Sequence, residues 1–217
     1  MDVQSFFSPD EVKEIERVVR DAEGGTSGEI VPYVVGRSDP YHEAFWRGAC
    51  LGALALALIA AAVHELGRFW GYGLLWLAVP PLVGAGLGWL AVAAWPWLRR
   101  ALLNDGQMDQ MVRMRAQGAF LEQEVFDTRE RTGILIFLSL FEHRVVVLAD
   151  SGINAKVRQD EWDSIVAGIA AGIRAGRPGA ALAEGIRRCG ALLAERRVER
   201  RADDTDELSD ALRLRTE

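Results

Sequence analysis

The sequence has little cysteine and lacks the motifs of several common protein classes. Of its 217 residues only Cys50 and Cys189 are cysteines, which excludes the disulfide framework of small secreted proteins. The formal net charge is −6 and no basic stripe with interleaved aromatic residues occurs, so we expect no nucleic-acid partner. A phosphate-binding glycine loop, a dinucleotide fingerprint and zinc-ligand spacing are also missing from the sequence.

The longest stretch without charge lies in the middle of the chain. Three residues between Arg47 and Arg99 can carry a charge: His64, Glu65 and Arg68. A helix needs about 20 apolar residues to cross a hydrocarbon core of about 30 Å. The pattern therefore predicts a two-helix transmembrane hairpin over residues 45–99. The alternative is a buried helical hairpin of a soluble protein.

The predicted spans cover about residues 46–63 and 72–98, and the short turn between them contains one arginine, Arg68. Arginines are more numerous at the outer ends of the hairpin: Arg37, Arg47, Arg99 and Arg100. By the positive-inside rule, both chain termini face the cytoplasm. Residues 1–8 have no basic and apolar segment of the signal-peptide type, so we expect a multi-pass protein of the bacterial inner membrane.

Each predicted span contains a G-x-x-x-G motif. Gly48 and Gly52 form one motif, and Gly84 and Gly88 form the other. Small residues at this spacing let the backbones of two helices approach closely in lipid. We expect these faces to pack within the hairpin, and the same motif also suits a homodimer.

The flanking segments are charged and patterned like one soluble α/β domain. We predict that residues 1–40 and 104–201 form it together, with the hairpin inserted, and that residues 202–217 are a disordered tail. The periodicity predicts a mixed sheet between helices in a small α/β/α sandwich. Expected helices cover residues 9–23, 109–131, 160–175 and 179–200, and expected strands cover residues 28–35, 134–140 and 144–149.

Two finer predictions concern packing in this domain. Pro32 cannot donate to a strand ladder, which predicts that the first strand lies at an edge of the sheet or carries a bulge. In the helix expected over residues 109–131, the following side chains are predicted to form the apolar face: Met111, Met114, Phe120, Leu121 and Val125.

Several short motifs resemble the TPM domain family, named for plant thylakoid members and a nematode receptor-accessory member. They are Phe7-Ser8-Pro9-Asp10-Glu11, Thr26-Ser27-Gly28-Glu29-Ile30-Val31, Thr132-Gly133-Ile134-Leu135-Ile136-Phe137, Arg144-Val145-Val146-Val147 and Asp150-Ser151-Gly152-Ile153. More narrowly, the chain is similar to uncharacterised bacterial membrane proteins in which two transmembrane helices split a TPM domain. The resemblance implies a small α/β/α sandwich with a mixed sheet.

The resemblance implies two different functions. Some family members act as accessory or assembly factors of membrane complexes, and a plant member is described as an acid phosphatase that binds divalent cations through acidic residues. We expect an accessory factor with a membrane-protein partner, because the sequence contains no catalytic signature. A divalent-cation-binding acid phosphatase is the alternative. A transporter is disfavoured, since the predicted spans contain no polar residue that would line a pathway.

For the enzyme alternative, candidate metal ligands follow the third strand. They are Asp150 at the end of that strand and Asp160 and Asp163 at the start of the next helix. Oxygen ligands of this kind suit Ca²⁺ or Mg²⁺. The same residues also have ordinary structural roles, because aspartates initiate turns and favour the first turn of a helix.

Overall fold

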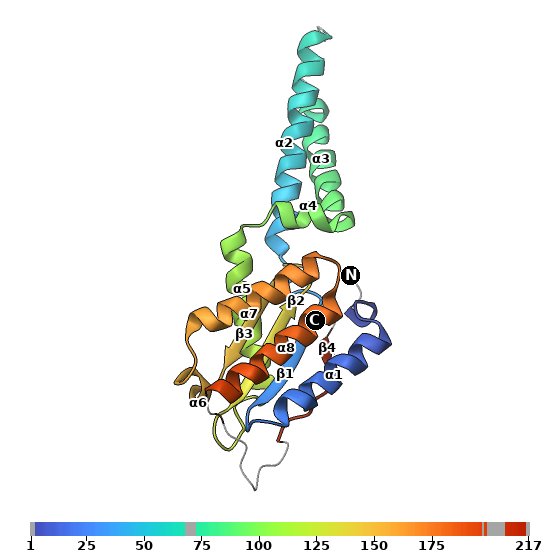
Figure 1. Cartoon of the computed structure of the whole chain (residues 1–217). Coiled ribbons are helices and arrows are strands. Elements are labelled where there is room, and N and C mark those ends of the chain that lie inside the picture. Colours follow the sequence, from blue (N-terminus) through green and yellow to red (C-terminus); the bar gives the residue numbers. More distant parts are fainter. Residues whose placement is uncertain (1–2, 68–72, 197, 199–206, 216–217) are drawn as a thin grey trace. The chain divides into compact units, whose positions relative to one another are not determined.

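The computed structural model describes residues 3–67, 73–196, 198 and 207–215 (Figure 1). The chain divides into two compact units. The α/β unit contains residues 1–39 and 109–217, and the helical unit contains residues 40–108. The α/β unit is thus discontinuous in sequence, with the helical unit inserted. The predicted polar turn around Arg68 lies outside the described residues.

The described part of the α/β unit contains a mixed sheet, as predicted, with four strands instead of the three expected. Its strands are β1 (Glu29–Val35), β2 (Gly133–Ser139), β3 (Arg144–Ala149) and β4 (Arg213–Arg215). The strand order is β3-β2-β1-β4, with β1 parallel to both β2 and β4, and β2 antiparallel to β3. The two long strands β1 and β2, which flank the helical unit in sequence, therefore form the centre of the sheet.

The prediction of a disordered tail is wrong for its last described residues. Arg213–Arg215 form strand β4, which pairs with Tyr33–Val35 of β1. Leu212 is buried in the core and Leu214 packs against it, so apolar side chains fix the segment to the domain. A run of three strand residues in a charged context is too short for periodicity to reveal.

Pro32 lies in an interior strand, so its predicted position at a sheet edge is wrong. The N–H groups of Ile30 and Gly36 both point away from β2, toward Glu23 and Arg215 respectively. Because the backbone N–H groups of successive residues in a strand point to opposite sides, the nitrogen of Pro32 also faces away from β2. The described pairing of β4 with β1 begins only at Tyr33, so Pro32 interrupts no ladder hydrogen bond on that side.

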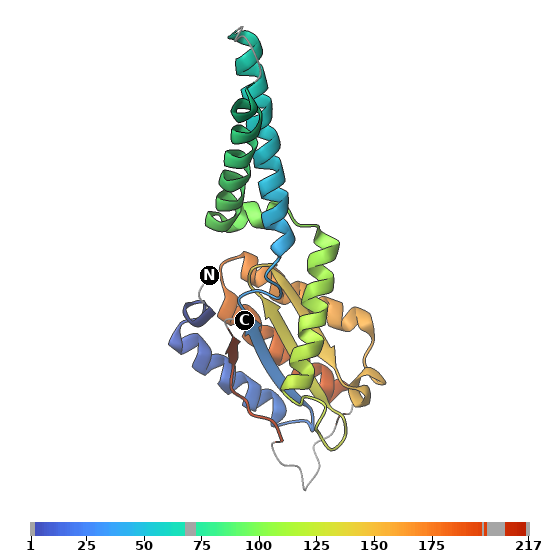
Figure 2. The same ribbon diagram turned by 180° about the vertical axis from the view of Figure 1, so that it is seen from behind.

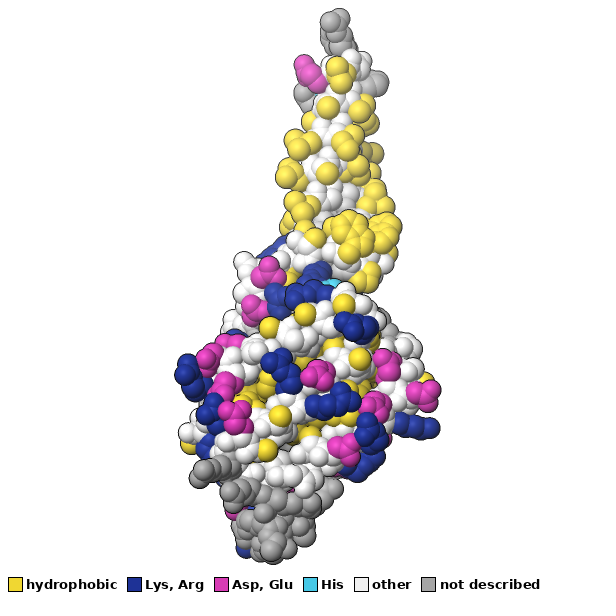
Figure 3. Space-filling view, in the orientation of Figure 1, with side chains coloured by type: hydrophobic (Ala, Val, Ile, Leu, Met, Phe, Trp, Pro, Cys, Tyr) yellow, Lys and Arg dark blue, Asp and Glu magenta, His cyan; other side chains and the backbone are white. Residues whose placement is uncertain are grey.

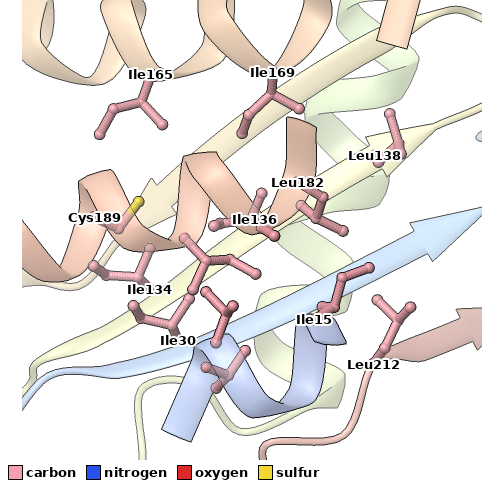
Figure 4. Packing of buried hydrophobic residues seen from close by; sticks show 14 of the residues in the cluster. Ile15, Ile30, Ile134, Ile136, Leu138, Ile165, Ile169, Leu182, Cys189 and Leu212 are labelled. Carbon is pink, nitrogen blue, oxygen red and sulfur yellow. The ribbon is translucent and has the colours of Figure 1, made fainter. Parts of the chain in front are cut away.

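Helices cover both faces of the sheet (Figures 1 and 2). One face packs against α1 (Pro9–Glu23), α7 (Gln159–Arg174) and α8 (Pro178–Glu195). Figure 4 shows this larger core, in which isoleucines and leucines of the strands interdigitate with those of the three helices. The other face packs against α5 (Asp105–Glu122) from residue 109 onward. The sheet is therefore the middle layer between helices, as predicted.

The start of α1 is fixed by reciprocal capping hydrogen bonds. The Ser8 hydroxyl accepts from the Glu11 N–H at 3.2 Å, and the Glu11 carboxylate accepts from the Ser8 N–H at 2.9 Å. These two hydrogen bonds form a capping box, which the S-x-x-E spacing of Ser8 and Glu11 favours. Glu11 also accepts from the N–H of Gly179 at 3.2 Å, which links the first turns of α1 and α8.

The apolar face predicted for residues 109–131 is wrong in part, since Val125 and Phe120 do pack in the core on this side of the sheet. Met114 and Leu121 are 54% and 63% exposed, and the side chains that pack on the sheet are smaller: Val112, Ala116 and Ala119. These small residues face the stacked rings of Tyr33 and Phe137, whose centroids are 5.7 Å apart. Bulky aromatic rings on the sheet leave room only for small side chains on the helix that covers them. A prediction that selects the most hydrophobic residues of the helix does not detect this. The helix also ends at Glu122, earlier than predicted.

The helical unit contains two long helices, α2 (His42–Leu66) and α3 (Leu74–Ala94), followed by the short α4 (Pro96–Ala101). Both long helices are long and apolar enough to cross a membrane. His64 lies in the last turn of α2 instead of in the predicted turn, and α3 continues through its two prolines. The predicted second span ends within α4, because the chain bends at Trp95 before Pro96 begins a new helix.

The two G-x-x-x-G motifs pack against each other inside the helical unit, as predicted. A Cβ atom added at Gly52 would lie 2.1 Å from the carbonyl oxygen of Gly84, and one added at Gly88 would lie 2.1 Å from that of Gly48. No side chain fits between the backbones at these two levels. Both motifs are therefore used within the hairpin, and a homodimer would need other surfaces.

This contact predicts different effects for two glycines of α3. Gly84→Ala places a methyl group 2.2 Å from the carbonyl oxygen of Gly52, so the helices must separate, and we expect a loss of about 1–3 kcal/mol in hairpin stability. Gly86→Ala meets nothing within 4 Å and is the matched control. Unfolding by SDS can be followed by tryptophan fluorescence, since six of the seven tryptophans lie between residues 46 and 97. Equal effects of the two substitutions would contradict the packing.

Candidate functional site

Asp150, the first predicted metal ligand, lies at the end of β3 with its side chain only 6% exposed. One carboxylate oxygen accepts from the N–H of Ser151 at 2.6 Å, so Asp150 is the N-cap of the short helix α6 (Ser151–Asn154). The other oxygen lies 2.9 Å from Nε of Arg131. The contact with Arg131 is an ion pair without hydrogen-bond geometry, because Oδ2 of Asp150 is buried and has no hydrogen-bond donor among the described groups.

The loop before β2 packs closely on this turn. A Cβ atom at Gly152 would lie 2.3 Å from the carbonyl oxygen of Glu130, and the Gly152 N–H donates to the carbonyl of Arg131 at 3.0 Å. Arg131 has a φ of +58°, a conformation that only a well-packed loop maintains in a residue other than glycine. The Asp150–Arg131 pair therefore joins the loop before β2 to the turn after β3.

Asp160 and Asp163, the other two predicted ligands, lie in the first turns of α7 and are exposed. Asp160 forms two hydrogen bonds of 3.0 Å with the Arg158 guanidinium, and Asp163 accepts from the side chain of Gln159 at 2.9 Å. Within the described ranges, no three His, Cys, Asp or Glu residues are arranged to hold a metal ion. The structure does not bring the three aspartates together as a cation site.

Glu161, between these aspartates, has a clear structural role. Its carboxylate accepts from the N–H of Arg158 at 2.9 Å and from the guanidinium of Arg196. These hydrogen bonds lower the pKa of Glu161, the Arg158 N–H contributing most. The start of α7 is thereby fixed to the end of α8, which gives Glu161 a structural role.

Cys189 lies in α8 and is buried in the core. Burial raises the pKa of its thiol to about 12. A nucleophilic cysteine requires a thiolate near neutral pH, so this side chain is a packing residue.

A buried polar network at the other end of the sheet was not predicted. Glu142, fully buried in the turn between β2 and β3, accepts from the N–H of Ser38 at 2.8 Å and from the hydroxyl of Ser139. The hydroxyl groups of Ser38 and Ser139 are 2.9 Å apart. The network fixes the end of β1 to the turn after β2. Its members come from distant parts of the sequence, so no local motif reveals it.

A second unpredicted group contains three carboxyl groups near the start of β1. Glu23 at the end of α1 accepts from the N–H of Ile30 at 2.7 Å, and it also contacts Asp210. Glu29 is buried and accepts from the N–H of Glu207 at 3.4 Å. The pKa of Glu23 is raised to about 9, mainly by burial and further by the neighbouring carboxylates of Glu29 and Asp210, against the opposing effect of the Ile30 N–H.

Comparison with known proteins gives a fold and no family. No protein-family model matches the chain, and no curated protein matches it. The chain is similar to the NMR structure of the BA42 protein from the psychrophilic bacterium Bizionia argentinensis, with a TM-score of 0.60 and 21% sequence identity. The match covers 97% of this chain and 96% of that chain. At this identity the similarity shows the fold alone.

The geometry predicts that Asp150 is a stability residue. Asp150→Ala removes the N-cap of α6 and the partner of Arg131, and we expect a loss of about 1–2 kcal/mol in the free energy of unfolding. Asp163→Ala is the control on an exposed helix start and should cost less than about 0.5 kcal/mol. Urea denaturation of the detergent-solubilised chain measures both values. An unchanged stability of Asp150→Ala would contradict the structural role.

Proposed function

We propose that this chain is a bacterial inner-membrane protein with a cytoplasmic TPM-like domain that acts as an accessory or assembly factor for a membrane complex. The helices α2 and α3 would be its transmembrane hairpin. The observation that carries this proposal is the outward-facing apolar surface of the two helices. In their most apolar windows, only 6% and 11% of the residues are buried.

This exposure argues against the soluble alternative. A core helix of a soluble protein is mostly buried, whereas large side chains such as Leu58, Leu75 and Leu82 are 62%, 75% and 72% exposed. Figure 3 shows that apolar side chains cover this hairpin and that charged side chains are spread over the α/β unit. With a rise of 1.5 Å per residue, α2 and α3 are about 37 and 31 Å long, which suits a hydrocarbon core of about 30 Å.

The outer ends of the hairpin carry aromatic and basic residues typical of a membrane interface. Trp46, Trp95 and Trp97 are exposed there. The guanidinium of Arg99 lies 4.6 Å from the ring centroid of Phe45, and Arg47 donates to the carbonyl of Leu102. Tryptophan favours the headgroup level, and arginines on this side favour a cytoplasmic location of both termini.

An accessory role fits the chemistry of the α/β unit. In the described residues, the candidate ligands are engaged in capping and ion pairs, and the cysteine is buried. A domain tethered to the bilayer by short connections gains effective concentration toward partners in the same membrane. This supports binding to a membrane protein as the activity of the domain. A divalent-cation-binding acid phosphatase is the alternative proposal.

The topology is tested with reporters in the intact chain. A reporter active only in the cytoplasm, fused at the C-terminus, should be active, and one inserted after Leu66 should be inactive. A periplasmic reporter should give the reverse pattern at the two positions. The chain should also stay in the membrane fraction after alkaline carbonate extraction. An active periplasmic reporter at the C-terminus would overturn the orientation, and release by carbonate would overturn the membrane anchor.

The two proposed functions are separated by an activity assay. The purified chain is tested against a panel of phosphomonoesters with and without Ca²⁺ or Mg²⁺, beside Asp150→Asn and Asp163→Asn. We expect no turnover from the folded protein with either cation. Cation-dependent turnover that Asp150→Asn abolishes, while its thermal melt persists, would instead establish the phosphatase and overturn the accessory role.

A further inference from the structure

The C-terminal segment Glu207–Arg215, here called the strap, lies against the α/β unit and ends in β4. Its strand contributes three residues to the sheet, and Leu212 is its buried apolar anchor. Such a short strand adds few ladder hydrogen bonds to β1. The polar contacts of the strap must therefore supply much of its attachment.

The polar contacts of the strap converge on the end of α1 and the start of β1. Asp210 lies 3.5 Å from the guanidinium of Arg20 and contacts the carboxyl group of Glu23. Upstream in the strap, the N–H of Glu207 donates to the carboxylate of Glu29. The carboxylate of Glu207 accepts from the N–H of Arg129 at 3.0 Å.

One oxygen of Asp210, Oδ1, is buried and has no hydrogen-bond donor among the described groups. Burying a carboxylate oxygen without a hydrogen bond lowers the stability of the folded state, unless a donor reaches the oxygen. Glu23 is the adjacent group that can provide a donor, because a protonated carboxyl has an O–H. If both groups were ionised, two negative charges would face each other beside the buried Glu29.

The basic residues nearby reduce this repulsion, but none of the described groups donates a hydrogen bond to Oδ1 of Asp210. Arg20 reaches Asp210 from α1, on the oxygen other than Oδ1. Arg213 of the strap is half-buried and donates to the side chain of Gln123 at 2.8 Å and to backbone carbonyls of the strap. The guanidinium of Arg213 is attracted by the carboxylates of Glu23 and Asp210 and repelled by Arg215. A proton between Glu23 and Asp210 remains the direct way to join the two carboxyl groups.

We propose that the strap is a proton-dependent latch, held on the sheet by one proton shared between Glu23 and Asp210 and released when that proton is lost. Release uncovers the edge of β1 that β4 occupies, including the Gly36 N–H that donates to Arg215. The proposal concerns the α/β unit alone and does not depend on the membrane anchor or on the accessory role.

The sign of the pH dependence follows from proton linkage. The pKa of Glu23 is about 9 with the strap in place, against an ordinary value of 4.5. Burial is the main cause of this shift and Asp210 adds to it, so release of the strap, which removes Asp210 and exposes Glu23, lowers the pKa of Glu23 and favours loss of the proton. The docking equilibrium constant should fall by up to tenfold per pH unit as the pH rises toward about 9, and should change little above that.

Alkylation of a buried cysteine measures release of the strap even when release is rare. The experiment uses the full chain with Cys50→Ser, in which Leu212→Cys places a thiol at the buried anchor. Peptide mapping distinguishes alkylation at position 212 from alkylation of Cys189. At each pH, the alkylation rate of the cysteine at position 212 in the chain is divided by the alkylation rate of the same cysteine in a free peptide of residues 207–217. This ratio cancels the ionisation of the thiol and reports the released fraction.

We expect the ratio to rise at least tenfold between pH 6.5 and 9 when Glu23 is present. Glu23→Gln and Asp210→Asn each provide an amide donor in place of the shared proton, so the rise should be less than twofold in both. Glu195→Gln removes an exposed carboxylate elsewhere and should behave like the parent. A ratio independent of pH in the parent, or the same rise in Glu23→Gln with an unchanged circular dichroism spectrum, would overturn the latch.

Discussion

The parallel pairing of β1 with β2 is the constraint on which the rest of the structure depends. The two strands are separated in sequence by the entire helical unit, yet they form the centre of the sheet in continuous register from Glu29–Gly133 to Val35–Ser139. Each is buried along its whole length, so each needs cover on both faces. Helix α5 provides one cover, and α1, α7 and α8 provide the other.

Polar groups at the two ends of this strand pair complete the arrangement. At one end, Glu142 connects the turn after β2 to Ser38 after β1. At the other end, the Thr132 hydroxyl donates to the carbonyl of Ser27 at 2.6 Å, and Asp150 pairs with Arg131. Buried polar groups of this kind need partners, and satisfying them fixes the loops. Of the three aspartates that suggested a cation site, Asp150 has such a role, whereas Asp160 and Asp163 are exposed.

The helical unit follows a different physical logic. Its two long helices approach each other through glycines and present large apolar side chains outward. In water this exposure would be costly, since each large apolar side chain loses about 1.5–3 kcal/mol of burial free energy. In lipid the same surface is favourable and close backbone packing holds the helices together. The α/β unit has the reverse pattern, with large apolar residues inside and charge outside.

The sequence alone determined the features that local periodicity and charge encode. These include the capping box at Ser8 and Glu11, the two apolar helices, the glycine contact between them and the mixed sheet between helices. Tertiary structure decided the features that depend on neighbours distant in sequence. The small residues of α5 face the sheet because the rings of Tyr33 and Phe137 occupy the space. Residues 213–215 became a strand because Leu212 is buried in the core.

The same division holds for the candidate site. Spacing alone placed Asp150 at a strand end and Asp160 and Asp163 at a helix start, and both placements are correct. Spacing could not reveal that Arg131 takes the carboxylate of Asp150, or that Glu23 and Asp210 meet, because these pairs form only when separate segments fold together. Local patterns are set by backbone geometry over a few residues. Charge pairing and burial are set by the whole fold, which no short segment contains.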